Sequence, residues 1–211
     1  MRRWAEPYLV LITDRSRLRG RSIEEVVCPA VEGGVNAVLL CEKDLATGDL
    51  YDLAMTLRHL LRGHALFLVD DRVDVALAVG ADGVHLPERS LPGKAARRIA
   101  GEACIIGRSV HSLEAAHRAE AEGDDYVQAG AVYETASHPG QAPGGIALLR
   151  SVAEAVRVPV IAVGGITESN VAEVIEGDAD GVAVISAIWD AADPKEAARA
   201  LRAALDEAYA G

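Results

Sequence analysis

Short apolar runs alternate along the whole chain with segments whose apolar residues recur about every 3.6 positions. Runs of four to seven largely β-branched residues are typical of strands buried on both faces, and the 3.6-residue spacing is typical of amphipathic helices. The predicted strands are Tyr8–Thr13, Ala37–Leu40, Ala65–Val69, Gly83–Leu86, Ile105–Gly107, Tyr126–Ala129, Val158–Ala162 and Gly181–Ile185. The predicted helices are Ser22–Glu32, Asp49–Leu61, Arg72–Val79, Gly93–Ile99, Ser112–Glu122, Ile146–Val156, Glu168–Glu176 and Pro194–Ala208.

This repetition predicts an α/β protein whose residues 1–211 form one (β/α)8 barrel domain. An open doubly wound sheet usually has fewer units and a glycine-rich turn after its first strand, whereas here the first strand continues into Thr13-Asp14-Arg15. Two similar phrases, at 80–84 and 178–182, lead into two different strands. We expect them to mark the N-terminal, stability-determining end of the barrel.

Residues at the expected helix starts support these boundaries. Ser22 and Glu25 have the spacing of a capping box, and Ser112 precedes another helix. Thr167 is expected to cap the seventh helix, and Asp193-Pro194 places a proline in the first turn of the last one.

The charge of the chain limits its partners. A formal net charge of −11 argues against nucleic-acid binding, which requires a basic surface. Because the overall field repels anions, a phosphate would have to be held by nearby backbone amides and a few local cations.

No apolar run approaches the roughly 20 residues that span a bilayer, and the first seven residues lack a signal-peptide core, so we expect a cytoplasmic protein without a membrane partner. The three cysteines form no CxxC pair, which argues against a zinc site.

In a β/α barrel, functional residues gather where the strands end. Gly164 and Gly165 follow the seventh predicted strand, and Ile185 and Ser186 end the eighth. Glycine lets backbone amides turn towards an anion, and barrels often bind phosphate between these two loops. The sequence therefore predicts a phosphate site here, although paired glycines also occur in plain tight turns.

Charged residues follow the second and third strands. Asp70 and Asp71 are oxygen ligands of the kind that Mg²⁺ prefers, but Asp71 could instead cap the helix that begins at Arg72. Lys43 could meet a phosphate or a ring, or lie free on the surface. His85 stands in an apolar phrase and is expected to be a hydrogen-bonded core residue.

Several phrases together resemble the superfamily of thiamine phosphate synthase and its relative TenI, the thiazole tautomerase. The resemblance covers nearly the whole chain and implies a (β/α)8 barrel in thiamine biosynthesis, with thiazole phosphate held by the loops after strands seven and eight. It also implies a homodimer. The phrases that carry it are Asp71–Leu77, Gly80–Leu86, Ser109–Glu114, Val163–Thr167 and Gly181–Ser186.

Departures from the synthase pattern argue against ordinary synthase activity. The resemblance implies Gln-Leu-Arg-Glu-Lys at the end of strand two, where this chain has Leu39-Leu40-Cys41-Glu42-Lys43, so the glutamine and the arginine are absent and Lys43 is the remaining cation. Ser90 stands where a second Mg²⁺ carboxylate is expected, and His138 stands where a lysine should meet pyrophosphate. Expelling pyrophosphate requires charge stabilisation that these residues do not supply.

The TenI branch requires one acid–base group for a proton shift and no metal. Its histidine position is Ala131 in this chain, so His138 or Glu134 is the candidate acid–base residue, with Ser109 and Thr135 expected to contact the ring. Our first hypothesis is therefore a TenI-like tautomerase without a cofactor.

Two alternatives remain open at this stage. One is a divergent synthase that keeps Asp71 as its Mg²⁺ ligand, with Lys43 and Asp70 contacting substrate. The other is a non-catalytic protein that binds thiazole phosphate.

Overall fold

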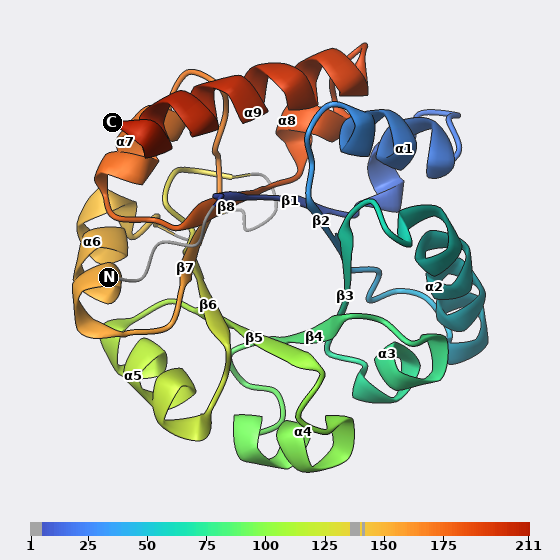
Figure 1. Ribbon diagram of the computed structural model, residues 1–211, viewed down its shortest axis with the longest axis horizontal. Coiled ribbons are helices and arrows are strands. Elements are labelled where there is room, and N and C mark those ends of the chain that lie inside the picture. Colours follow the sequence, from blue (N-terminus) through green and yellow to red (C-terminus); the bar gives the residue numbers. More distant parts are fainter. Residues whose placement is uncertain (1–5, 136–139, 141) are drawn as a thin grey trace.

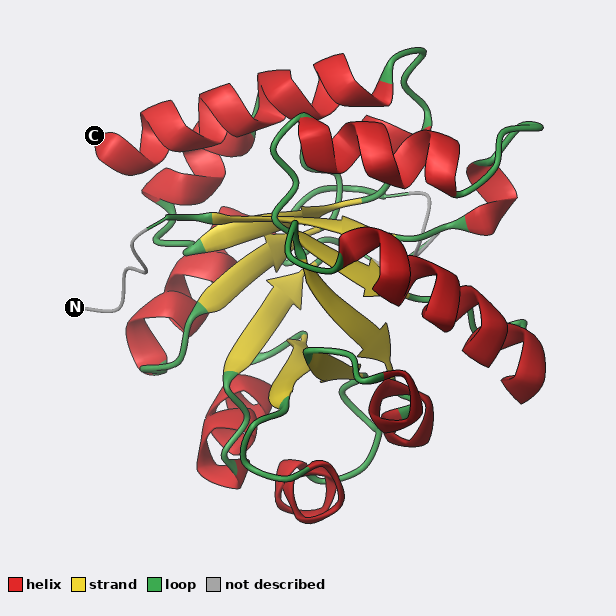
Figure 2. Cartoon of the chain, turned by 45° about the vertical axis from the view of Figure 1, so that its right-hand side comes forward, coloured by secondary structure: helices red, strands yellow, loops and turns green. Residues whose placement is uncertain are grey.

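Eight parallel strands close into a barrel in the order β1 to β8, with the helices on the outside of the ring (Figure 1). The computed structural model describes residues 6–135, 140 and 142–211. The longest helix, α9 (Pro194–Ala210), packs against α1 (Glu24–Glu32) and α7 (Val171–Glu176), beside the junction where β8 pairs with β1 (Figure 2). The predicted single barrel is confirmed. No helix in the described part of the chain is both long and apolar enough to cross a membrane.

The elements follow the predicted alternation, with small shifts at their ends. The strands are β1 (Tyr8–Ile12), β2 (Ala37–Leu40), β3 (Leu66–Asp70), β4 (Gly83–Leu86), β5 (Ile105–Val110), β6 (Tyr126–Gly130), β7 (Val160–Val163) and β8 (Gly181–Val184). The remaining helices are α2 (Thr47–Leu61), α3 (Val73–Val79), α4 (Gly93–Ala100), α5 (Leu113–Glu122), α6 (Gly145–Ala155) and α8 (Ser186–Trp189), with a short 3₁₀ helix, η1 (Arg15–Arg17). Neither η1 nor α8 was predicted, because each is too short to show a helical period.

Most of the predicted helix caps are present. The backbone N–H of Ser22 donates to Glu25 Oε2 at 2.6 Å and that of Glu25 donates back to Ser22 Oγ at 3.3 Å, which is a reciprocal capping box. The Ser112 side chain caps α5. The cap predicted at Thr167 is wrong, because the Thr167 N–H donates to Asn170 Oδ1 at 2.8 Å and closes a turn, so that α7 begins only after Asn170.

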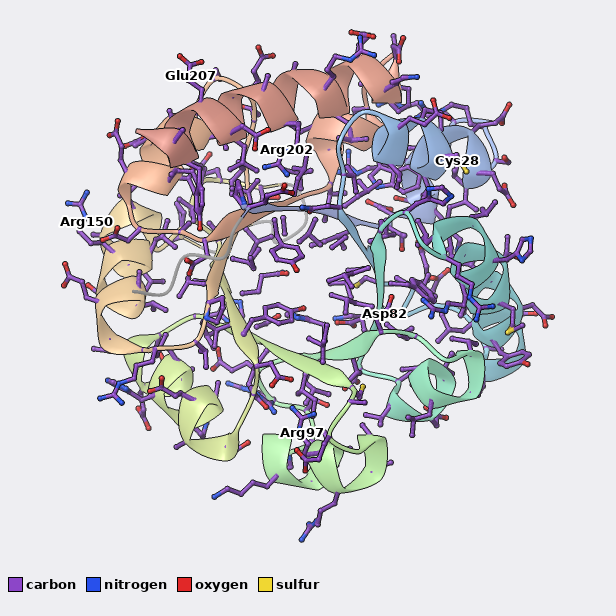
Figure 3. The ribbon with its side chains drawn as sticks, in the orientation of Figure 1. Cys28, Asp82, Arg97, Arg150, Arg202 and Glu207 are labelled. Atoms are coloured by element: carbon purple, nitrogen blue, oxygen red, sulfur yellow. The ribbon has the colours of Figure 1, made fainter. Side chains whose placement is uncertain are left out.

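Four short polar side chains fix the strand register at the N-terminal end of the barrel. Each directly precedes an even-numbered strand, and its side-chain oxygen accepts a backbone N–H near the start of the odd-numbered strand before it. The bonds are Leu9 N–H to Asn36 Oδ1 (2.9 Å), Phe67 to Asp82 Oδ2 (2.8 Å), Ile106 to Asp125 Oδ2 (2.7 Å) and Val160 to Asp180 Oδ2 (2.9 Å). The two repeated phrases of the sequence therefore mark half of a fourfold pattern, and Figure 3 shows Asp82 beside the strands.

Alternate residues of the strands fill the barrel. Val10, Leu39, Leu68 and Ile161 belong to one buried interior cluster. A cavity of about 250 Å³ lies near the N-terminal ends of the strands, lined by Tyr8, Val10, Ala37, Leu66, Leu68, Ile105, Asp125, Tyr126, Pro159 and Ile161. Because barrel chemistry gathers at the opposite end, this apolar cavity is not the candidate site.

Candidate functional site

The loops after β7 and β8 lie side by side, because these two strands are hydrogen-bonded neighbours. Gly164 and Gly165 follow β7, and α8 begins at Ser186 directly after Ile185. The backbone N–H groups of Gly165, Ser186 and Ala187 donate to no acceptor within the described residues. The structure thus brings the four residues of the predicted phosphate site together around unpaired donors, which is the arrangement that an anion requires.

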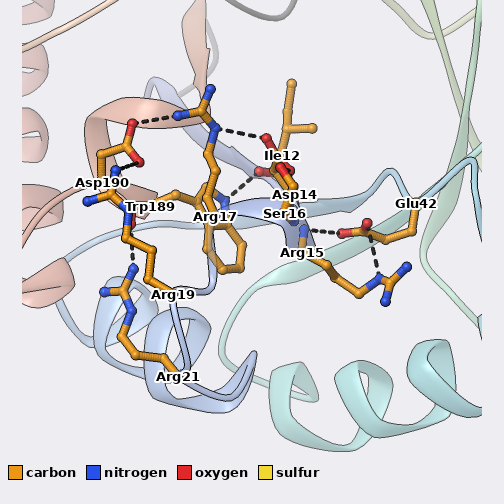
Figure 4. Close-up of polar contacts among 10 residues, drawn as sticks. All are labelled: Ile12, Asp14, Arg15, Ser16, Arg17, Arg19, Arg21, Glu42, Trp189 and Asp190. Atoms are coloured by element: carbon orange, nitrogen blue, oxygen red, sulfur yellow. Dashed lines mark hydrogen bonds and ion pairs between the residues drawn. The ribbon is translucent and has the colours of Figure 1, made fainter.

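The short helix α8 is held firmly in place. The buried Trp189 donates its indole N–H to the carbonyl oxygen of Ile12 at 2.8 Å. The guanidinium of Arg17 joins Asp14, at 2.8 Å, to Asp190 just beyond α8, at 2.5 Å (Figure 4). Both contacts tie the C-terminal end of α8 to β1 and the loop after it, and because α8 is a single helical turn, they also limit the movement of the amides at its start.

The loop after β6 packs over the glycine turn. Gly165 has a left-handed φ of +66°, and a Cβ there would lie 2.6 Å from the carbonyl oxygen of Glu134 and 2.7 Å from Tyr133 Cβ. The Tyr133 hydroxyl donates to Glu173 at 2.7 Å, which fixes this loop to α7. Glu134 is exposed and Thr135 is half-buried; the Glu134 backbone lies against Gly165, and the roles of both residues remain predictions. His138 lies outside the described residues.

Asp70 and Lys43 form an ion pair across the mouth of the barrel, with Lys43 Nζ 3.5 Å from Asp70 Oδ2. Burial raises the pKa of the Asp70 carboxyl, while Lys43 opposes the rise. Cys41 also contacts Asp70, and burial together with this carboxylate raises the pKa of the thiol to about 12. The protonated Cys41 therefore supplies a neutral group where the synthase pattern has arginine.

Asp71 faces the neighbouring loop rather than its own helix. The Ser90 hydroxyl donates to Asp71 Oδ1, so the two positions that the family pattern assigns to Mg²⁺ are adjacent in space. The alternative role of Asp71 as a helix cap is wrong, because Arg72 is the cap residue of α3 and no side chain caps that helix. Within the described residues no three His, Cys, Asp or Glu side chains converge as a metal site. A divalent ion would consequently need oxygen ligands from its substrate.

His85 lies inside the barrel on β4, only 1% exposed, and is hydrogen-bonded through both ring nitrogens. It is the satisfied core histidine that the sequence predicted, but one of its partners is Ser109, a predicted ring contact at the mouth of the barrel. Burial lowers the pKa of His85 to about 3, with smaller contributions from Arg108 and Lys43. The imidazole is therefore neutral at any ordinary pH.

Acid should destabilise the fold through His85. In the unfolded chain the His85 imidazole binds a proton below about pH 6.5, whereas in the folded chain it stays neutral down to about pH 3. The free energy of unfolding should therefore fall as the pH falls through this window, by up to about 1.4 kcal/mol per pH unit for this one group. Urea unfolding of His85→Gln between about pH 5 and 7 should show a shallower slope than the wild type. His59→Gln, at an exposed site on α2, should keep the full slope; equal slopes for both variants would contradict the assignment.

Tyr126 is the residue of this site that the sequence reasoning missed. Its hydroxyl is the second partner of His85, at 2.9 Å from Nδ1. Strand alternation places Tyr126 on the interior face with Gln128, and Gly107 on β5 pairs with it in register. A tyrosine on the inward face of one strand, opposite a glycine on the next, could have indicated from the sequence that the Tyr126 ring extends into the barrel interior.

Comparison with known proteins supports this architecture. The family model described as "Thiamine monophosphate synthase" matches residues 9–188. A thiamine-phosphate synthase of Haloquadratum walsbyi is 46% identical over 202 residues, which cover 94% of this chain and 91% of that protein. One from Pyrococcus furiosus is 44% identical, covering 94% and 95%. The structure named thiamine phosphate pyrophosphorylase from Pyrococcus furiosus superposes with a TM-score of 0.87 at 44% identity, covering 95% of this chain and 96% of that one.

The fold and the site define a single-domain (β/α)8 barrel whose polar residues gather at the C-terminal ends of its strands. The matches narrow that class further. The chain belongs to the thiamine monophosphate synthase family. The name of the family model, TMP-TENI, also refers to the TenI proteins. A 3-hexulose-6-phosphate synthase structure, at 20% identity and a TM-score of 0.73, shares the fold alone.

Proposed function

We propose that the chain binds a phosphorylated thiazole, with its phosphate held by backbone amides at Gly164, Gly165, Ile185 and Ser186. The observation that carries this proposal is the set of unpaired N–H groups in the two adjacent turns after β7 and β8. In a protein of net charge −11, such local donors are the main attraction for an anion. Ser109 and Thr135 would contact the ring.

The reaction that the relatives favour is that of a thiamine-phosphate synthase, the second of the sequence-based hypotheses. In the resemblance drawn from the sequence, this enzyme joins a pyrimidine pyrophosphate to thiazole phosphate. Three relatives with this name are 42–46% identical to this chain over more than nine-tenths of both sequences, and this similarity supports the same reaction here. It takes precedence over the tautomerase hypothesis because the relatives from Haloquadratum walsbyi and Pyrococcus furiosus are named thiamine-phosphate synthases and Ala131 replaces the tautomerase's expected histidine.

Asp71 and Ser90 offer adjacent oxygen donors that fit Mg²⁺ once pyrophosphate oxygens complete the set. The ion would supply charge neutralisation for the departing pyrophosphate. Lys43 would add the one retained cation of strand two, and the buried Asp70 would orient it from 3.5 Å.

Purified protein should form thiamine phosphate from both substrates in the presence of Mg²⁺, and EDTA should stop the reaction. Asp71→Asn should lower kcat by about 100-fold or more, because it removes the one carboxylate at the proposed ion site. Asp74→Asn, an exposed carboxylate nearby that pairs with Arg72, is the matched control and should change kcat little. Absence of product from the wild-type protein at high substrate concentration rejects the synthase function.

A TenI-like tautomerase is the second candidate, because charge-handling positions of the synthase pattern hold Cys41, Ser90 and His138. In this function Glu134 or His138 would move the proton, and no metal would be needed. Conversion of the thiazole carboxylate phosphate tautomer by protein that makes no thiamine phosphate would support it. If His138→Ala and Glu134→Gln both retain that turnover, these residues are not the acid–base groups. Binding of thiazole phosphate without synthase or tautomerase activity would identify a non-catalytic binding protein. The homodimer remains a prediction.

A further inference from the structure

Three polar side chains form a hydrogen-bonded line inside the barrel, from β6 through β4 to the mouth at β5. The Tyr126 hydroxyl lies 2.9 Å from His85 Nδ1, and Ser109 Oγ lies 2.8 Å from His85 Nε2. Tyr126 is 6% exposed and His85 is 1% exposed, whereas Ser109 is half-buried at the functional end. The line therefore runs from Tyr126, which also lines the apolar cavity of the interior, to the proposed ligand site.

The surroundings of Tyr126 determine which way its hydrogen bond runs. Within the described part of the chain, the Tyr126 hydroxyl has one hydrogen-bond partner, His85 Nδ1. If Nδ1 carried the proton and donated, the hydroxyl hydrogen of Tyr126 would be left unpaired in an apolar interior, at a substantial free-energy cost. Tyr126 consequently donates to Nδ1, and the neutral imidazole carries its proton on Nε2.

The direction of the first bond fixes the second. Because Nε2 is protonated, it donates to Ser109 Oγ, and the serine hydroxyl hydrogen is left to point elsewhere. Gly107 makes room for this arrangement, since a Cβ at that position would lie 2.0 Å from Tyr126 Cζ. The tyrosine ring can reach His85 only because residue 107 has no side chain.

We propose that Tyr126 is a positioning residue that fixes the tautomer of His85 and thereby makes Ser109 a hydrogen-bond donor towards the bound ring. The preferred ligand then presents an acceptor to Ser109, such as an unprotonated ring nitrogen or a carboxylate oxygen. A ring that offers an N–H at the same point is disfavoured, because the Ser109 oxygen already faces one donor. This inference rests on the proposed function only in placing Ser109 against the ligand.

The tautomer can be measured without any ligand. In protein labelled with ¹⁵N-histidine, the His85 resonances should show a protonated Nε2 and an unprotonated Nδ1. Tyr126→Phe removes the donor to Nδ1 and should produce a mixture of the two tautomers. Tyr51→Phe, at an exposed site on α2, is the control and should leave His85 unchanged. A protonated Nδ1 in the wild type, or a Tyr126→Phe variant with the pure Nε2–H form, overturns the proposal.

A double-mutant cycle tests whether the effect passes through Ser109. With thiazole phosphate as the probe, Ser109→Ala and Tyr126→Phe should each weaken binding by about three- to ten-fold. The double variant should bind no more weakly than Ser109→Ala alone, because Tyr126 has nothing left to orient. Multiplying effects would instead indicate a merely structural role for Tyr126 and would reject the proposal.

The two experiments separate the inference from the proposed function. If wild-type protein fails to bind thiazole phosphate, the proposed function fails, while the tautomer spectrum still decides whether Tyr126 directs His85. If binding is normal but the spectrum shows the opposite tautomer, the positioning role alone is rejected.

Discussion

Asp124→Ala should lower the free energy of unfolding by about 3–5 kcal/mol, the largest stability effect that we expect from a single polar substitution in this barrel. Asp124 Oδ2 accepts from Arg108 Nε at 2.5 Å, and the two side chains are 0% and 5% exposed. Among the residues that the structure describes, removing the carboxylate leaves the buried guanidinium with the carbonyl oxygens of Pro87 and Leu91 and a weak contact to Glu122. Urea or thermal unfolding measures the loss, and the midpoint temperature should drop by roughly 10 °C.

The matched control is Glu196→Ala, which breaks the ion pair with Arg199 on the surface of α9. Both side chains of that pair are 58% exposed, so the expected change is below about 0.5 kcal/mol. Equal losses for the buried and the exposed pair would contradict the assignment of the Arg108–Asp124 pair as a structural element. Arg108 also bonds the carbonyl oxygens of Pro87 and Leu91, on either side of Ser90. Asp124→Ala should therefore also weaken Mg²⁺ binding at the proposed ion site, which would be measured as a higher Mg²⁺ concentration required for half-maximal activity.

Gly165→Ala should reduce the affinity for thiazole phosphate by about 10- to 100-fold, the loss expected when hydrogen bonds to a charged group are misaligned. A Cβ at residue 165 would meet the backbone of Glu134 at 2.6 Å, so the loop after β6 or the glycine turn itself must move. Either movement displaces the Gly165 amide from the anion. Isothermal titration of purified protein with thiazole phosphate measures the change.

Gly80→Ala provides a control with nearly the same backbone. Gly80 has a φ of +64°, close to the +66° of Gly165, but a Cβ there has no atom within 4 Å. Both variants should therefore lose about 1–2 kcal/mol of stability from the left-handed conformation, while only Gly165→Ala should lose affinity. If both variants bind thiazole phosphate like the wild type, the turn after β7 does not hold the phosphate.

Much of the barrel follows from local features of the sequence. Apolar runs, helical spacing and caps such as Ser22 and Ser112 depend on neighbours within a few residues, so they can be recognised along the chain. The misplaced cap at Thr167 shows where this approach fails. Asn170 bonds both the Thr167 N–H and the Gly165 carbonyl, and this turn competes with the first helical turn.

The candidate site is predictable only in part. Strand ends could be located, so Gly164, Ser186 and Asp71 were named for the right end of the barrel. The contacts of these residues could not be predicted. Ser90 reaches Asp71 from a different βα loop, and Cys41, after β2, contacts Asp70 at the end of the neighbouring strand β3. Such contacts depend on the register between strands, which the local pattern does not specify.

The sequence by itself therefore determined that the chain alternates strands and helices eight times, and which residues stand at the strand ends. Only the tertiary structure decided that Tyr126, His85 and Ser109 form one hydrogen-bonded line, although the first and second are 41 positions apart. The physical reason is that periodicity and capping are properties of short segments, whereas hydrogen bonds inside the barrel exist only once the closed ring has brought distant strands into register.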